Sequence, residues 1–189
     1  TGLGQNIGMG TGIYSLSKAN AQFSGNNNTG IGQSIFSLTN GDLTGNKNTG
    51  IGQNLFNLTN GDLTGSNNIG MGDGVFNITA GDFSGNHNIG IGTEVMNASQ
   101  GIAGDYNIAL GYQPMTTSGN IVGTNNIAIG YRAIWPVNTN IGSYNIGIGN
   151  WALWGNMAKG NANIQLGNWY VGTPVAGQLN QVVAIGNQM

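Results

Sequence analysis

The stretch Gly85-Asn-His-Asn-Ile-Gly-Ile-Gly92 recurs with small changes along the whole 189-residue chain. We number each copy from its second Asn, so that Asn88 is position zero, Ile89 is +1 and Gly92 is +4. A regular step of this kind is typical of repeat proteins, in which each copy forms one rung of a stack. The ten zero positions, 18 to 22 residues apart, are Asn6, Asn28, Asn48, Asn68, Asn88, Asn107, Asn126, Asn145, Asn163 and Val182.

Each copy alternates with a period of two residues, which indicates a β-strand. Large residues, mostly aliphatic, stand at +1 and +3, whereas +2 is almost always Gly or Ala and +4 is Gly. Position +8 is large and apolar, which predicts a side chain that packs into the interior of each rung. Its occupants are Tyr14, Phe36, Phe56, Phe76, Met96, Met115, Ile134, Leu153 and Val171. The pattern therefore predicts an all-β fold, a parallel β-solenoid or β-roll of about ten rungs of 18–22 residues.

The nearly bare Gly face of each strand predicts a close approach of another backbone. We expect this face to press against copies of the same chain in a parallel homotrimer, a rod on the order of 50 Å long if rungs are about 4.8 Å apart. We treat residues 1–189 as a single repeat array. Residues 1–100 have regular 20-residue rungs, and residues 101–189 have shorter rungs rich in aromatic residues.

The composition narrows the possible partners and chemistry. Only 5% of residues are charged, the net charge is -2 and only four residues are basic, so we expect no nucleic-acid partner. No apolar run has the length of a membrane-spanning helix, and we expect no membrane insertion. The chain has no Cys and a single His, His87. It therefore lacks the ligands of a typical zinc site and the residues of a nucleophile that depends on Cys or His. We expect no cofactor and no enzymatic activity.

Two stretches of the second half resemble a known family. Asn126-Ile-Ala-Ile-Gly-Tyr-Arg-Ala-Ile134 and Asn140-Ile-Gly-Ser-Tyr-Asn-Ile-Gly-Ile-Gly149 resemble the N-T-A-I-G-Y-x-A-L and T-G-S-Y-N-T-A-I-G repeats of phage tail-fibre proteins. In that family such arrays often precede a chaperone domain that is cleaved after trimerisation. The core motif is also similar to the head repeats of trimeric autotransporter adhesins, which form parallel β-rolls. The resemblance implies a trimeric surface fibre.

Three acidic residues, Asp42, Asp62 and Asp82, occupy the same point of successive rungs. A ladder of carboxylates could bind Ca²⁺ or form part of a glycan-cleaving site, since hard cations bind oxygen ligands and glycosidases use paired carboxylates. The alternative, which we favour, is an Asn-Gly-Asp turn in which each Asp accepts hydrogen bonds from backbone amides nearby.

The Asn at position zero forms a second ladder. We expect its side-chain amides to bond from rung to rung, as in cross-β stacks. An exposed ice-binding array is the other possibility, but it needs a regular Thr or Asn surface, and Thr29 and Thr49 are soon replaced by Ile at +1.

Large aromatic residues replace polar ones in the second half of the array. Trp135 and Trp154 stand at +9, where earlier rungs have Ser or Asn, and Trp151 and Trp169 stand at +6. Tyr112 and Tyr131 replace Gln at +5. If these columns face outward, the aromatic rings form a ligand-binding strip suited to sugar rings or to a protein anchor. If the shorter rungs repack, the same rings become core or trimer contacts.

These patterns favour a structural and receptor-binding segment of a viral tail fibre, located in the virion and attached to a host cell-surface glycan or protein receptor. Its other partner is itself, as a homotrimer. The alternatives are a trimeric adhesin at a bacterial cell surface and a purely structural spacer without a ligand. A depolymerising tailspike would need carboxylate pairs in a groove, which the sequence does not visibly provide.

Overall fold

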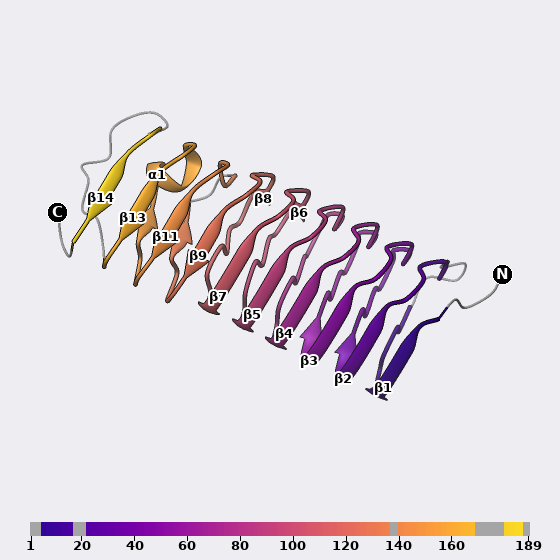
Figure 1. Cartoon of the computed structure of the whole chain (residues 1–189). Helices are drawn as coiled ribbons and strands as arrows, with labels where there is room; N and C mark the ends of the chain where they lie inside the picture. The colour runs from indigo at the N-terminus through magenta and orange to yellow at the C-terminus, as the bar shows by residue number, and fades with distance from the viewer. Residues whose placement is uncertain (1–4, 17–21, 137–139, 169–179, 187–189) are drawn as a thin grey trace.

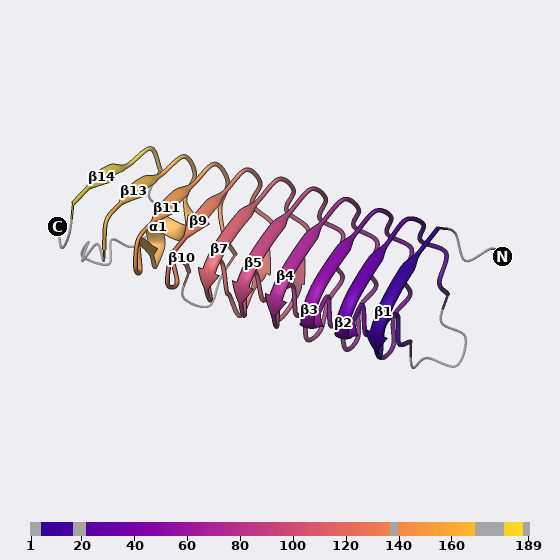
Figure 2. The same cartoon turned by 60° about the horizontal axis from the view of Figure 1, so that its bottom comes forward.

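The computed structural model describes residues 5–16, 22–136, 140–168 and 180–186, and these form an elongated parallel β-solenoid (Figure 1). One strand from each copy joins a single sheet of ten parallel strands that runs from end to end. The view in Figure 2 shows the same strands side by side, with the two ends of the chain at opposite ends of the rod. The predicted all-β solenoid is thereby confirmed.

The sheet follows the order of the chain. Its strands are β1 (Ile7–Thr11), β2 (Thr29–Ile35), β3 (Thr49–Leu55), β4 (Ile69–Asp73), β5 (Ile89–Thr93), β7 (Ile108–Tyr112), β9 (Ile127–Ile129), β11 (Ile146–Ile148), β13 (Ile164–Leu166) and β14 (Val183–Ile185). Equivalent repeat positions pair, for example Ile31 with Ile51 and Ile51 with Met71.

Short pairings on the return path of the chain close each rung. The small strands are β6 (Gly101–Ile102) with β8 (Asn120–Ile121), and β10 (Ile134–Trp135) with β12 (Leu153–Trp154). Isolated parallel bridges continue two such columns toward the N-terminus, one through Leu38 and Leu58 and the other through Leu43 and Leu63. The only helix in the described part of the chain is α1, a single turn over Asn156–Lys159.

The core of the rod is one column of apolar side chains at +7, +8 and the return path. Phe36, Phe56 and Phe76 are fully buried, and their ring centroids lie 4.9 Å apart from rung to rung. Met96, Met115, Ile134 and Leu153 continue the +8 column and are also fully buried. The predicted inward position of +8 is therefore confirmed, except at Val171, which lies outside the described residues.

The Gly face of the sheet points into this core, which contradicts our expectation that it presses against other copies of the chain. Gly30, Gly50 and Gly70 at +2 are buried. A Cβ added at Gly50 would lie 2.6 Å from Cγ2 of Ile35, and one at Gly70 would lie 3.2 Å from the ring of Phe76. From β2 to β11 the large +7 and +8 side chains fill the interior, and +2 is Gly or Ala; in β13 the buried Gln165 takes this position.

The large residues at +1 and +3 point outward instead. We call these side chains the aliphatic stripe; it runs along the whole outer face of the sheet. Its large apolar members that are more than a third exposed are Ile7, Met9, Ile31, Ile51, Ile69, Met71, Ile91, Ile148, Leu166, Val183 and Ile185.

The Asn at position zero is the polar part of the interior. The eight residues from Asn28 to Asn163 in this column are fully buried. The Nδ2 group of Asn88 donates to the carbonyl of Gly104 at 2.9 Å, and its Oδ1 accepts the backbone N–H of Asn107 at 2.9 Å. The rung-to-rung amide ladder is present, with Asn107 Nδ2 donating to Asn88 Oδ1 at 3.1 Å, but most of the bonds go to backbone groups. These Asn residues therefore tie successive turns together where water has no access.

Candidate functional site

The aromatic residues of the second half gather at the corner that follows the main sheet. This corner is a left-handed turn at +6, with positive φ values of 52° at Glu94, 53° at Gln113, 49° at Arg132 and 55° at Trp151. Earlier rungs place Gly12, Ser34, Asn54 and Gly74 at this point. Gly and Asn adopt this conformation readily, whereas a long side chain is held in it at a cost on the order of 1 kcal/mol. The second half therefore carries bulky side chains where the backbone favours small ones.

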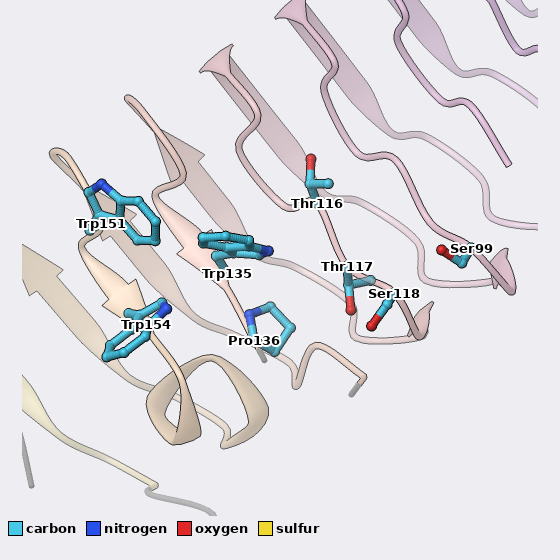
Figure 3. Close-up of a pocket in the computed structure, with 8 residues that line it drawn as sticks. All are labelled: Ser99, Thr116, Thr117, Ser118, Trp135, Pro136, Trp151 and Trp154. Atoms are coloured by element: carbon cyan, nitrogen blue, oxygen red, sulfur yellow. The ribbon is translucent and has the colours of Figure 1, made fainter. Parts of the chain in front are cut away.

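Three Trp side chains come together around this corner (Figure 3). The ring centroids of Trp135 and Trp151 are 4.7 Å apart, and those of Trp151 and Trp154 are 6.3 Å apart in an edge-on arrangement. Trp135 and Trp151 are half-buried, and Trp154 is 40% exposed. The rings are therefore partly open to solvent, and they are absent from the fully buried core column.

Tyr112 and Tyr131 extend the cluster along the rod. Their rings stack at a centroid distance of 5.6 Å, and Tyr131 meets the edge of Trp151 at the same distance. Tyr112 is exposed and Tyr131 is half-buried. Five of the six aromatic residues singled out from the sequence thus form one connected surface. The sixth, Trp169, lies outside the described residues.

Arg132 lies at the centre of the aromatic cluster. Its guanidinium carbon is 4.1 Å from the ring centroid of Trp135, 4.9 Å from that of Trp151 and 5.1 Å from that of Tyr131. These distances are within the range of cation–π attraction. The positive charge therefore holds rings from two successive rungs in one arrangement.

A column of polar side chains fixes Arg132 from the next rungs toward the N-terminus. Its Nε donates to Oε1 of Gln113 at 2.6 Å, and Nε2 of Gln113 donates to Oε2 of Glu94. All three residues occupy +6, so they are stacked directly above one another. This column is not among the sites predicted from the sequence, although aligning the copies at +6 is enough to place these three residues and Trp151 in one line.

A cavity of about 430 Å³ opens beside the Trp cluster. One wall is apolar and consists of Trp135, Trp151, Trp154 and Pro136, and the other consists of the hydroxyl residues Ser99, Thr116, Thr117 and Ser118. Figure 3 shows the two walls, with the aromatic side chains on one side and the hydroxyl groups on the other. The hydroxyl residues come from two earlier rungs, and the sequence analysis did not identify them.

The Asp ladder has a structural arrangement. Oδ1 of Asp62 accepts the backbone N–H of Asp42 at 2.7 Å, and Oδ1 of Asp82 accepts that of Asp62 at 2.9 Å. Oδ1 of Asp42 accepts the N–H of Gln22 in the same way. Each of these carboxylates thus bonds the amide of the preceding rung. Among the described residues, no group of three or more His, Cys, Asp or Glu side chains is arranged to hold a metal ion.

A second aromatic surface lies on the corner at −1. His87 stacks on Tyr106 with a centroid distance of 4.8 Å, and Tyr106 and Tyr144 are both more than half exposed. This corner therefore provides exposed aromatic residues for comparison with the Trp cluster.

Comparisons of the chain with protein-family models, curated proteins and solved structures find no match. Within the described residues, helical structure is too short and too polar to cross a membrane. The aromatic cluster and its cavity are therefore the features of the chain from which a function can be inferred.

Proposed function

We propose that the chain is a non-enzymatic, receptor-binding segment of a phage tail fibre, and that it attaches a virion to a host cell surface. The observation that carries this proposal is the cluster of three partly exposed Trp rings beside a cavity, on a scaffold that elsewhere carries Ser and Asn in the same column. Partly exposed aromatic residues are favourable contact groups, because they bury a large area at a small cost in side-chain entropy.

The scaffold supports this role because it holds the aromatic groups rigidly. Each rung is hydrogen-bonded to its neighbours through the main sheet and through the buried Asn column. The site spans rungs that begin at Asn88, Asn107, Asn126 and Asn145, so its geometry depends on the stacking of those rungs. A preformed site of this kind loses little conformational entropy when a ligand binds.

We further propose that the functional form is a homotrimer, with the aliphatic stripe as its interface. Ten strands about 4.8 Å apart and two outward side chains per strand make an apolar surface on the order of 500 Å². An exposed apolar patch of this size is at the upper end of what monomeric proteins present. Around a threefold axis the stripe of each chain would contact the stripes of both neighbours, which replaces the predicted Gly-face contact.

Trimerisation would give three identical sites on one rod. Weak individual sites bind a cell surface tightly when they are linked, because binding at one site raises the effective ligand concentration for the others. The proposed mechanism of attachment is therefore avidity.

The experiment that tests the function is binding of the labelled rod to a panel of bacterial strains. We expect the variant with both Trp135→Ala and Trp154→Ala to lose binding to every strain that the parent protein binds. Tyr144→Ala is the matched control, since Tyr144 is an exposed aromatic residue outside the cluster. If the double variant keeps its fold by circular dichroism and binds as the parent does, the proposed site is wrong.

A further inference from the structure

We infer that the cavity beside the Trp cluster binds an uncharged pyranose ring of a host-surface glycan. This inference rests on the proposed function and names the class of ligand that the same site takes. It follows from the chemistry of the two walls, from the absence of charge on them and from the size of the cavity.

The two walls match the two kinds of surface on a sugar ring. A pyranose has a face of C–H groups, which stacks on an aromatic ring, and a rim of hydroxyl groups, which donate and accept hydrogen bonds. Trp135, Trp154 and Pro136 supply the apolar wall, and Ser99, Thr116 and Ser118 supply hydroxyl groups opposite it. A hydroxyl group has one donor and two acceptor positions, so Thr116, which donates to the carbonyl of Glu94 at 2.9 Å, still has acceptor capacity.

The charge around the cavity favours a neutral ring over an acidic one. None of the described residues that line the cavity is ionisable. A carboxylate placed there would lose water without gaining a charged partner, which is unfavourable. Arg132 does not line the cavity; its guanidinium lies against aromatic rings and its Nε donates to Gln113.

The volume and the lining of the cavity favour a sugar over an anchor residue of a protein receptor. A volume of about 430 Å³ is within the usual range of small-ligand sites. An apolar protein side chain would offer no hydrogen bonds to the hydroxyl groups of this wall, whereas a sugar provides them along its rim. The mixed lining is therefore best matched by a small polyhydroxylated ring.

The test is a titration of the purified rod with methyl glycosides. Binding is measured by Trp fluorescence and by saturation-transfer NMR of the glycoside protons. The probes are the methyl pyranosides of glucose, galactose, mannose and N-acetylglucosamine, with methyl glucuronide as the acidic counterpart. We expect at least one neutral glycoside to bind and the glucuronide to bind about tenfold more weakly or not at all. Tighter binding of the glucuronide, or no binding of any neutral glycoside, overturns the inference.

Two variants assign the signal to the cavity. Trp154→Ala removes an exposed part of the apolar wall and should weaken glycoside binding about tenfold, since loss of one stacked ring costs up to about 1.5 kcal/mol. Trp154→Phe keeps a ring for stacking and should bind with intermediate affinity. Equal affinity of Trp154→Ala and the parent protein places the sugar elsewhere and overturns the assignment.

Treated cells separate this inference from the proposed function. Periodate cleaves the vicinal diols of surface sugars, and a protease removes surface proteins. We expect periodate to abolish binding of the rod to a susceptible strain and protease to leave it intact. Binding that survives periodate but is lost after protease treatment shows a protein receptor; this overturns the glycan inference and leaves the attachment function standing. If the parent protein binds no strain but still binds a neutral glycoside, the proposed attachment function is wrong and the inferred sugar site is supported.

Discussion

Replacing one residue of the buried Asn column, Asn88→Ala, should loosen the rod at that rung. The Nδ2 group of Asn88 donates to Gly104, and its Oδ1 accepts the N–H of Asn107. Both backbone groups lie in buried residues, and no other hydrogen bond to either group is present among the described residues. The substitution therefore leaves one donor and one acceptor without a partner and without water.

The size of the effect follows from these two groups. An unsatisfied buried polar group costs about 1–3 kcal/mol, so two of them should lower the local free energy of unfolding by about 2–6 kcal/mol. Adjacent rungs of a repeat protein unfold with some independence, and a single global transition is a poor measure of a local change. The suitable assay is hydrogen–deuterium exchange at the amide of Asn107, which should exchange at least about 30-fold faster in the variant.

Asn60→Ala is the control for this prediction. Asn60 is exposed, and its Oδ1 accepts only the side-chain amide of Asn40 at 2.8 Å. Its removal should change stability by no more than about 0.5 kcal/mol. If Asn88→Ala and Asn60→Ala have the same small effect on exchange, the buried Asn column does not hold the rungs together.

Three further predictions follow from the geometry. Gly72→Ala should prevent folding or cost more than about 3 kcal/mol, because Gly72 has a φ of +131° and a Cβ there would lie 1.8 Å from the carbonyl oxygen of Gly92. Gly155→Ala is the control: an added Cβ would have nothing within 4 Å, so the substitution should cost only about 1 kcal/mol in thermal unfolding. Equal costs for the two variants would refute the reasoning. Burial raises the pKa of Tyr14 to about 12 from 10.0. The stability contributed by the protonated Tyr14 is therefore full below pH 10 and is lost as the pH rises through 12. The melting temperature of Tyr14→Phe should lack this alkaline loss, and the same dependence of melting temperature on pH in the variant and the parent protein would contradict the prediction. Arg132→Met should lower stability by about 0.5–2 kcal/mol and weaken the near-ultraviolet circular dichroism of the Trp cluster, and an unchanged spectrum would show that the cation does not order the rings.

The repeat pattern is enough to predict the strands, the length of each rung and the +8 side chains that fill the core, because stacking in register places equivalent residues together. The residue at +8 is apolar in each of the first nine copies, and this column is fully buried from Phe36 to Leu153. The buried Asn column follows from the same regularity. Here local pattern and global fold agree, so inference from the sequence is sound.

The inward face of the strand could not be predicted from its period. Alternation separates an aliphatic face from a Gly face and does not say which of them is covered. The deciding factor is volume: Ile35 and Phe36 fill the interior so completely that Gly30 must lie opposite them. The site was found only in part, because the hydroxyl wall joins the Trp cluster across neighbouring rungs. Arg132 shares +6 with Trp151, so an alignment of the copies at that position is enough to place it.

We propose that function lies in the aromatic rungs and that the regular rungs are scaffold. The decisive measurement is hydrogen–deuterium exchange of the rod with and without purified envelope from a susceptible strain. We predict slower exchange confined to residues 99–136 and 140–154, around the aromatic cluster and its cavity. Slower exchange over the regular rungs of residues 28–98, with no change around Trp135 and Trp154, would contradict the claim.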